Sequence, residues 1–207
     1  MMSKTHIAVG LAAGLAIAQT GSPESCIAAI VGGSVGGIMA DCDITPSRAH
    51  KDALIGRLAV LALVVVCLVV DYRINAGLCG YLIGRMGVSF AMGIAFFVVL
   101  TGLGAHTEHR SFTHSLVAMA AFSGTIQLIC PLLLPYFAMG YGSHLALDVT
   151  NKQGITLFWP FKTRSSLGLC RAKGPANTVA LVLGIAAATL LLVYRLGSFV
   201  NISIVFG

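Results

Sequence analysis

Seven apolar stretches occupy most of this chain and strongly limit the folds open to it. A membrane-spanning helix needs about 20 apolar residues, and most of these stretches are that long or nearly so. We predict crossings at residues 7–20, 26–40, 53–70, 87–104, 115–135 and 176–195. The first of these is short, as is a further stretch at 136–150. Since 57% of the residues are hydrophobic and only 10% are charged, the composition excludes an ordinary soluble domain.

The predicted fold class is therefore all-α, a polytopic integral membrane helical bundle of about six or seven helices. Residues 1–207 contain no internal repeat or linker, so we expect a single domain. Glycines recur four residues apart as Gly10 and Gly14 in the first stretch and as Gly33 and Gly37 in the second. Small residues at this spacing let helix backbones approach closely in lipid, which favours a packed opening hairpin.

The cysteines and the first 20 residues are two further features of the sequence. The six cysteines are scattered without paired CxxC spacing, so we interpret most of them as small hydrophobic residues. The first 20 residues also have the pattern of a signal peptide, with a cleavage-like site at Ala16-Ile17-Ala18. Cleavage there would remove His6.

The basic residues are distributed unequally between the two sides of the membrane. If every stretch crosses once, the loops 41–52, 105–114 and 151–175 lie on the side where the chain begins. That side receives Lys4, Arg48, Lys51, Arg57, Arg110, Lys152, Lys162, Arg164, Arg171 and Lys173. The other side receives Arg73, Arg85 and Arg195. By the positive-inside rule, the first side is predicted to be cytoplasmic.

Histidines and acids also gather on the predicted cytoplasmic side. Its boundary holds His6, Asp41, Asp43, His106, Glu108, His109, His114 and Asp148, and His144 lies about one helical turn deeper. Random placement of polar residues in loops would spread them over both sides. This convergence predicts a polar site near the cytoplasmic face.

The segment "SHLALD" places His144 and Asp148 four residues apart. On a helix the two side chains share one face and could bind one ion, or they could simply pair with each other.

Two acids follow the second apolar stretch. Asp41 and Asp43 would face the negative end of a helix dipole, and Pro46 disfavours further helix. Arg48 and Lys51 could compensate the acids from a solvated loop. A divalent ion would neutralise both acids at once, and carboxylates with imidazoles suit Zn²⁺, Mn²⁺ or Fe²⁺.

The segment "EHRSFTHSL" concentrates charge between two apolar stretches. A turn or helix start could direct His109 and His114 inward, with Ser111 and Thr113 as candidate caps. Arg110 would then be free to hold a phosphate or carboxylate. The alternative is an ordinary hydrated loop, and Glu108 is a weaker candidate for a supporting base.

The segment after Asp148 carries aromatic and basic residues. Phe158, Trp159 and Phe161 are typical of a boundary belt. The cations that follow set topology and attract lipid headgroups, or alternatively hold a substrate phosphate. They are Lys162, Arg164, Arg171 and Lys173.

Four blocks together resemble a known family. "EHRSFTHSL", "GYGSHLALDVTNKQGITLFWP", "DCDITPS" and the early His6 are similar to the YdjM-like membrane-bound metal-dependent hydrolases, some of which are regulated by LexA. The resemblance covers about residues 1–165 and implies a multi-pass protein of the bacterial inner membrane with its first segment retained. Because the family has been likened to zinc-dependent phospholipase C, it also implies phosphoester hydrolysis. The implied metal-site residues are His6, Asp41, Asp43, His109, His114, His144 and Asp148, with Arg110 beside them.

Three functions follow as hypotheses. The first is a hydrolase with one or two divalent ions, Zn²⁺ ahead of Mn²⁺ or Fe²⁺, acting on a membrane lipid or lipid-linked phosphoester and not on nucleic acid. Its candidate catalytic residues are Arg110, Asp43 and His109. The second is a metal carrier or binding protein, which should place polar groups through the membrane depth. The third is metal-free hydrolysis by Ser143 or Ser111, although Ser143 and His144 do not face each other on a helix.

Overall fold

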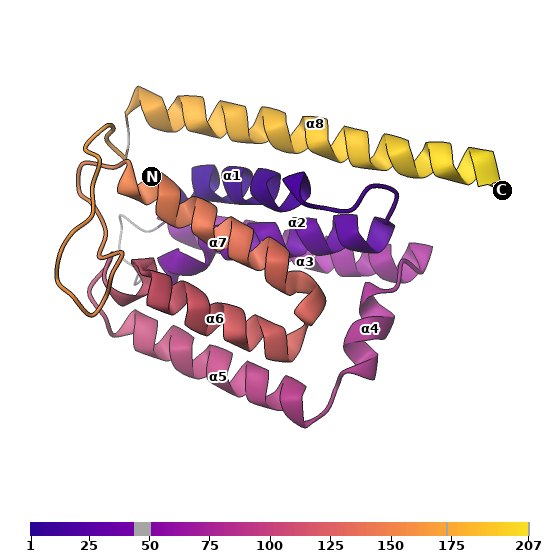
Figure 1. Cartoon of the computed structure of the whole chain (residues 1–207), viewed down its shortest axis with the longest axis horizontal. Helices are drawn as coiled ribbons and strands as arrows, with labels where there is room; N and C mark the ends of the chain where they lie inside the picture. Colours follow the sequence, from indigo (N-terminus) through magenta and orange to yellow (C-terminus); the bar gives the residue numbers. More distant parts are fainter. Residues whose placement is uncertain (44–50, 173, 207) are drawn as a thin grey trace.

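The protein is a bundle of eight α-helices in the part of the chain described by the computed structural model, which covers residues 1–43, 51–172 and 174–206, with side chains outside 51–53 and 199–206 (Figure 1). The helices are α1 (Ser3–Ala16), α2 (Pro23–Met39), α3 (Lys51–Ile74), α4 (Leu78–Gly84), α5 (Val88–Ala105), α6 (Leu116–Ile129), α7 (Leu134–Val149) and α8 (Pro175–Phe206). The same described residues also form the short 3-10 helices η1 (Ala40–Asp43), η3 (Phe112–His114) and η4 (Pro131–Leu133). No β-strand forms within these ranges, so the all-α prediction is confirmed.

Glycines bring α1, α2 and α7 into backbone contact. A Cβ on Gly10 would lie 2.6 Å from the carbonyl oxygen of Gly33, and a Cβ on Gly140 would lie 2.3 Å from the same oxygen. The Gly33 carbonyl of α2 therefore lies between α1 and α7. Only glycine, which has no Cβ, lets the three helices approach this closely. The packed opening hairpin predicted from the small-residue spacing is confirmed, and α7 joins it.

Four helices are long and apolar enough to cross a membrane. Their spans are Pro23–Asp43, Leu54–Ile74, Val88–Ala105 and Pro175–Ser198. The span of α2 is 83% buried inside the bundle, whereas those of α3, α5 and α8 are 22%, 11% and 11% buried. The last three helices therefore expose apolar faces suited to lipid, while α2 lies inside the bundle in contact with α1, α3 and α7.

The predicted crossing at 115–135 is wrong in its extent. α6 ends at Ile129, and Cys130 then has an extended backbone (φ −153°) before Pro131 opens η4. Proline lacks the N–H that would continue the helical hydrogen bonds, so the apolar run is divided between two elements. α6 has 14 residues, fewer than the roughly 20 that a full crossing needs.

The connections gather at two opposite ends of the bundle. Figure 1 shows Met1, η1 and the segments 106–115 and 150–174 at one end, which we call the polar end. The connection between α1 and α2, the helix α4 and the end of α8 lie at the other. This alternation is the arrangement predicted from the apolar stretches.

One helix was not predicted. Residues 71–86 were expected to be a loop, but they contain α4, which begins after Gly77 (φ +112°). The Asp71 carboxylate accepts hydrogen bonds from the backbone N–H groups of Leu78 (3.0 Å) and Cys79 (2.7 Å). An acid at the end of α3 thus caps the first turn of α4, a contact between two elements that local sequence patterns do not reveal.

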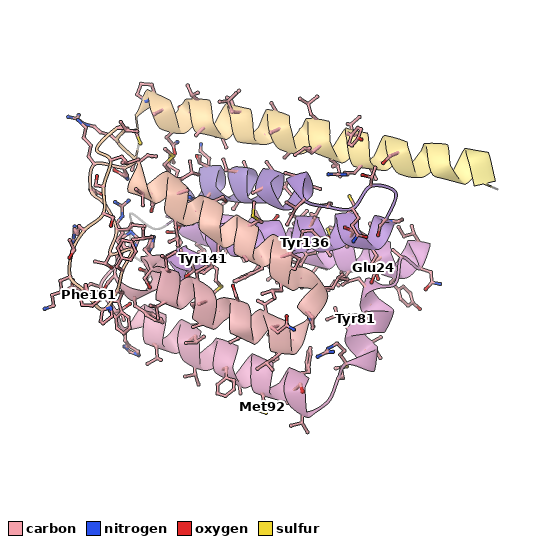
Figure 2. All side chains as sticks on the ribbon, viewed as in Figure 1. Glu24, Tyr81, Met92, Tyr136, Tyr141 and Phe161 are labelled. Atoms are coloured by element: carbon pink, nitrogen blue, oxygen red, sulfur yellow. The ribbon has the colours of Figure 1, made fainter. Side chains whose placement is uncertain are left out.

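The segment 150–174 folds over the polar end. Two isolated bridges, Asn151 with Cys170 and Ile155 with Ser165, hold its two arms together. The Trp159 ring packs edge-on against Phe112, with centroids 5.2 Å apart, which joins the segment to η3. Figure 2 shows Phe161 on this segment, far from Glu24 and Tyr81 at the opposite end. Phe161 is 71% exposed, as expected of an aromatic residue at a membrane boundary.

Candidate metal centre

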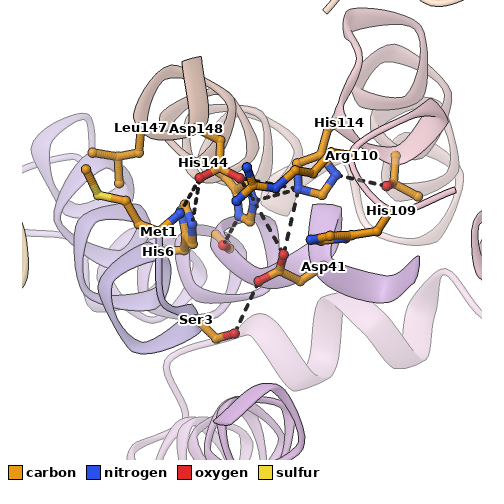
Figure 3. Close-up of polar contacts among 12 residues, drawn as sticks. Met1, Ser3, His6, Asp41, His109, Arg110, His114, His144, Leu147 and Asp148 are labelled. Atoms are coloured by element: carbon orange, nitrogen blue, oxygen red, sulfur yellow. Dashed lines mark hydrogen bonds and ion pairs between the residues drawn. The ribbon is translucent and has the colours of Figure 1, made fainter. Parts of the chain in front are cut away.

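The predicted site residues come from four separate parts of the chain and meet at the polar end (Figure 3). His6 lies on α1, Asp41 and Asp43 on η1, His109 and His114 around η3, and His144 and Asp148 on α7. Six of the seven are buried, and only His109 is exposed. All seven belong to three overlapping groups of three residues, and within each group the ligand atoms lie within 4.8 Å of one another. The groups are His6–His144–Asp148, Asp41–His114–His144 and Asp43–His109–His114.

His144 is oriented by the backbone of α2. Its Nδ1 lies 2.8 Å from the carbonyl oxygen of Gly37, which can only accept a hydrogen bond, so Nδ1 carries the hydrogen. The lone pair is therefore on Nε2, which points into the cluster. Histidine ligands to metals are commonly oriented by such a hydrogen bond on their other nitrogen.

His114 is oriented through a hydroxyl group. The Thr113 hydroxyl donates to Asp43 Oδ2 (2.7 Å), and its oxygen lies 3.1 Å from His114 Nδ1. Since the hydroxyl hydrogen goes to Asp43, Nδ1 of His114 is assigned as the donor to Thr113, and Nε2 keeps its lone pair. Tyr141 supports this turn by donating to the Thr113 carbonyl at 2.5 Å.

Two lone pairs and two carboxylates thus converge, and we call Asp41, His114, His144 and Asp148 the central group. The two Nε2 atoms lie 3.4 Å apart. Asp41 Oδ1 lies 3.7 Å from His114 Nε2 and 3.8 Å from His144 Nε2. Asp148 Oδ2 lies 3.5 Å and 3.7 Å from the same two atoms. Figure 3 shows these four side chains directed toward one another.

These separations suit a small divalent cation. In a tetrahedral zinc site, ligand atoms about 2.0–2.1 Å from the ion are about 3.3–3.4 Å from one another. The separation of the two Nε2 atoms and the four between an Nε2 atom and a carboxylate oxygen run from 3.4 to 3.8 Å, close to that spacing. Two imidazoles and two carboxylates form the mixed nitrogen and oxygen set that Zn²⁺, Mn²⁺ and Fe²⁺ accept. The residues present therefore fit the ion.

Asp41 and Asp148 each direct one carboxylate oxygen into the central group and use the other for a contact outside it. Asp41 accepts a hydrogen bond from the Ser3 hydroxyl on Oδ2 (3.2 Å), which leaves Oδ1 for the central group. Asp148 presents Oδ1 to His6 Nε2 at 3.3 Å and also pairs with the α-amino group of Met1. α1 thus holds both acids from outside the central group.

His6 packs against the central group. Its ring stacks on His144 with centroids 3.7 Å apart and planes 15° apart. Both ring nitrogens are buried. Nε2 lies 3.3 Å from Asp148 Oδ1, but neither nitrogen makes a well-aligned hydrogen bond with a described residue. Burying an imidazole in this way costs free energy unless the Asp148 carboxylate or a cation compensates it.

Asp43 and His109 form the outer part of the cluster. His109 Nδ1 lies 3.0 Å from Asp43 Oδ1, while Asp43 Oδ2 accepts from the Arg110 backbone N–H (3.2 Å) and from Thr113. The Asp43 side chain is fully buried, but that of His109 is 46% exposed. Both loop histidines thus direct a ring nitrogen into the cluster, and His109 is the one that also reaches solvent.

Arg110 lies beside the cluster, as expected. It adopts a left-handed backbone conformation (φ +67°), which is uncommon for a residue with a side chain. Its Nη1 is buried without a hydrogen-bond partner in the described structure. A strained backbone and an unpaired guanidinium nitrogen are features more typical of functional sites than of structural loops.

The predicted helix caps are wrong. Ser111 makes no capping hydrogen bond, and the Thr113 hydroxyl is used by Asp43. Ser115 caps α6 instead, by accepting from the backbone N–H of Ala118 (3.1 Å). The reason is that η3 occupies Phe112–His114, so α6 begins two residues beyond His114.

A cation that was not predicted also lies next to the acids. Arg48 lies outside the described residues, and so does the side chain of Lys51. Arg57 of α3 donates from Nη2 to the Asp41 backbone carbonyl at 2.6 Å. His106 and Glu108 are exposed and lie outside the three groups.

Sequence reasoning missed the residues that orient the ligands. They are Ser3, Gly37, Arg57, Thr113 and Tyr141. Thr113 alone gave a signal, because it directly precedes His114 in the polar segment. The others act through single contacts made by tertiary packing.

Comparison with known proteins identifies the family of the chain. The model of the YdjM inner membrane protein family matches residues 1–206, well beyond the four blocks in which the resemblance was noticed. No curated protein and no solved structure matches the chain. With this match and four helices of membrane-spanning length, the chain belongs to the YdjM inner membrane protein family and is a multi-pass protein of the inner membrane.

Proposed function

We propose that the protein is a hydrolase that binds one divalent metal ion in the central group and cleaves a phosphoester of a membrane lipid or lipid-linked molecule. The observation that carries the proposal is the 3.4 Å separation of the His114 and His144 Nε2 lone pairs, flanked by Asp41 and Asp148. Four buried groups of this kind repel one another unless a cation or a proton lies among them. Because the site has two carboxylates, which carry two negative charges, it favours a divalent ion.

A divalent ion in such a site lowers the pKa of a bound water and polarises a phosphoryl oxygen. His6, Ser3 and Thr113 would position the ligands, through Asp148, Asp41 and His114 respectively.

Asp43 and His109 are suited to proton transfer. With the Nδ1 hydrogen directed at Asp43, the His109 ring has its lone pair on Nε2, on the exposed side of the cluster. We assign Nε2 of His109 as the general base that takes a proton from the attacking water, with Asp43 holding the ring in that tautomer. The Arg110 guanidinium would stabilise the negative charge that develops on the phosphoryl group.

The basic residues support a cytoplasmic location for this site. The polar end holds Lys4, Arg57, Arg110, Lys152, Lys162, Arg164 and Arg171 among the described residues. The opposite end holds Arg73, Arg85 and Arg195. Positive charge is retained on the cytoplasmic side of multi-pass proteins, so we place the site there.

The test is turnover of phospholipids by the purified protein in vesicles. We expect phosphoester cleavage that a chelator abolishes and a divalent metal restores. His109→Ala and Arg110→Ala should lower kcat by about 100-fold or more, by analogy with the loss of a general base or of a charge-stabilising donor. Ser143→Ala should retain activity, because the Ser143 hydroxyl donates to the Gly140 carbonyl (2.7 Å) and is not part of the cluster. Turnover that resists chelation and requires Ser143 would replace this proposal with serine hydrolysis.

A metal carrier is the competing function. A carrier needs polar groups through the membrane depth. The cluster lies at one end, and the predicted crossings 53–70, 87–104 and 176–195 contain no acid or histidine. Metal uptake into vesicles without lipid hydrolysis would support the carrier instead.

A further inference from the structure

A pocket of about 380 Å³ opens next to the cluster, between the segments 106–115 and 150–174. Its lining includes Arg110, Trp159, Lys162 and Arg164, and we call it the basic pocket. The volume falls within the range of small-molecule sites, about 300–1,000 Å³. The pocket shares His109 and Arg110 with the proposed active site, so a molecule bound there would lie beside the reacting group.

The lining of the basic pocket is strongly positive. It contains three cations, Arg110, Lys162 and Arg164, and one acid, Glu108, which gives a net charge of +2 with His109 neutral. Arg110 contributes a buried nitrogen without a partner among the described residues. Since the Arg110 guanidinium is assigned to the phosphoryl group that is cleaved, Lys162 and Arg164 are the cations of the pocket that a second anion would contact, and arginine binds phosphate and carboxylate through paired N–H groups.

The pocket is built into the fold. The Arg110 carbonyl accepts two hydrogen bonds from Thr156, one from the backbone N–H and one from the hydroxyl, both at 3.1 Å. The Arg110 backbone N–H in turn donates to Asp43 at 3.2 Å. Arg110 therefore links the wall of the pocket to the cluster by hydrogen bonds on both sides of its backbone.

The pocket also carries aromatic residues of the kind found at the depth of lipid headgroups. Trp159 is 37% exposed and Phe161 is 71% exposed, and both line the pocket. Aromatic residues of this kind concentrate at the boundary between the hydrocarbon layer and water. A lipid that enters from the membrane would meet this wall with its headgroup.

We propose that the basic pocket binds a phosphoryl group on the headgroup of a lipid, separate from the phosphoester cleaved at the central group. This inference rests on the proposed function, because it assigns the cleaved phosphate to the central group and a second one to the pocket. The preferred substrate class is a phospholipid whose headgroup carries an additional phosphate. A zwitterionic headgroup would place its ammonium group among three cations and would be disfavoured.

The chain supplies its own reporter for binding. Trp159 is the single tryptophan, so tryptophan emission reports the pocket alone. Protein in detergent with a chelator present is titrated with short-chain phosphatidylinositol monophosphate, and in parallel with the same phosphatidylinositol lacking the extra phosphate. Inorganic phosphate is the third probe, since it distinguishes a free anion from a lipid headgroup.

We expect the monophosphate lipid to bind about tenfold more tightly than phosphatidylinositol, as one charge-assisted phosphate contact should provide. The double variant Lys162→Ala with Arg164→Ala should lose this preference. The matched control is Lys152→Ala with Arg171→Ala, which removes the same charge from two exposed residues outside the pocket and should keep the preference. Inorganic phosphate should bind more weakly than the monophosphate lipid.

Three results would overturn the inference. They are equal binding of the two lipids, equal loss in the two double variants, and binding of inorganic phosphate as tight as that of the lipid. Failure of the proposed function is separate. A preference that persists in chelator, in a protein that hydrolyses no lipid with any metal, would refute the hydrolase and retain the phosphate site. Metal-dependent hydrolysis of both lipids with the same KM would retain the hydrolase and refute the phosphate site.

Discussion

The Nε2 atoms of His114 and His144 face each other at 3.4 Å in the buried interior of the polar end. Each ring uses its Nδ1 elsewhere, His144 for the Gly37 carbonyl and His114 for the Thr113 hydroxyl. Two lone pairs this close repel each other unless a positive charge lies between them. The carboxylates of Asp41 and Asp148 add two negative charges, so the compensating positive charge must exceed one unit. The proposed metal site follows from this relationship.

The Thr113 hydroxyl should be required for tight metal binding. Thr113→Val removes the group that connects Asp43 to His114 while keeping the shape of the side chain. We expect metal affinity to fall about 10–100-fold, as for other residues that orient a histidine ligand. Competition with a chromophoric chelator measures the affinity. Thr113→Ser, which keeps the hydroxyl, should restore it, and wild-type affinity in Thr113→Val would show that His114 is oriented in another way.

Metal removal should destabilise the protein. A ligand present at about 100 times its Kd stabilises the folded state by about 2.7 kcal/mol, so a chelator should lower Tm and added Zn²⁺ should restore it. Asp41→Ala should make Tm insensitive to both. The control is Glu24→Gln, which alters an acid at the opposite end and should respond as the wild type does. An unchanged wild-type Tm in chelator would count against a bound ion.

The contact between α1, α2 and α7 should tolerate no side chain at its centre. A Cβ at Gly33 would lie 2.6 Å from the Gly10 carbonyl oxygen, so Gly33→Ala must separate the helices. We expect a loss of about 1–3 kcal/mol, typical of an overpacked core, measured by denaturation in detergent. Gly124→Ala is the matched control, since a Cβ there meets no described atom within 4 Å. Equal stability of the two variants would show that the helices are packed differently.

The polar end should face the cytoplasm. Leu169 lies on the segment 150–174 and Met86 follows α4, and both are well exposed, at 72% and 65%. In intact spheroplasts, a membrane-impermeant maleimide should label Met86→Cys above the background of the native cysteines, and Leu169→Cys only after permeabilisation. The reverse pattern would move the site to the periplasm.

Much of the bundle could be predicted because apolar length and charge bias are properties of local sequence. The apolar stretches correctly predict every α-helix of the described chain except α4. The stretch 115–135 was predicted as one helix, but α6 ends at Ile129. The missed α4 depends on Asp71 capping it from another helix, and local patterns carry no record of such contacts.

The candidate site was predictable for a related reason. The spacing of His144 and Asp148 places their atoms 3.7 Å apart, as one helical turn requires. Asp41 and His114 were expected beside them from membrane depth alone, and the structure brings the ligand atoms of both to within 3.8 Å of His144 Nε2. The roles of Ser3, Gly37 and Tyr141 could not be predicted, because each acts through one oxygen atom whose position is set by packing.

The most direct test is the metal content of the purified protein, measured by elemental analysis of wild type and three variants. The account predicts about one divalent transition-metal ion per chain in the wild type, as a single site of this ligand number holds. Ser143→Ala should keep the ion, while His144→Ala and Asp41→Ala, on helices far apart in the chain, should both lose it. A wild-type protein that contains no such ion and takes up none of Zn²⁺, Mn²⁺ or Fe²⁺ on dialysis would contradict the account.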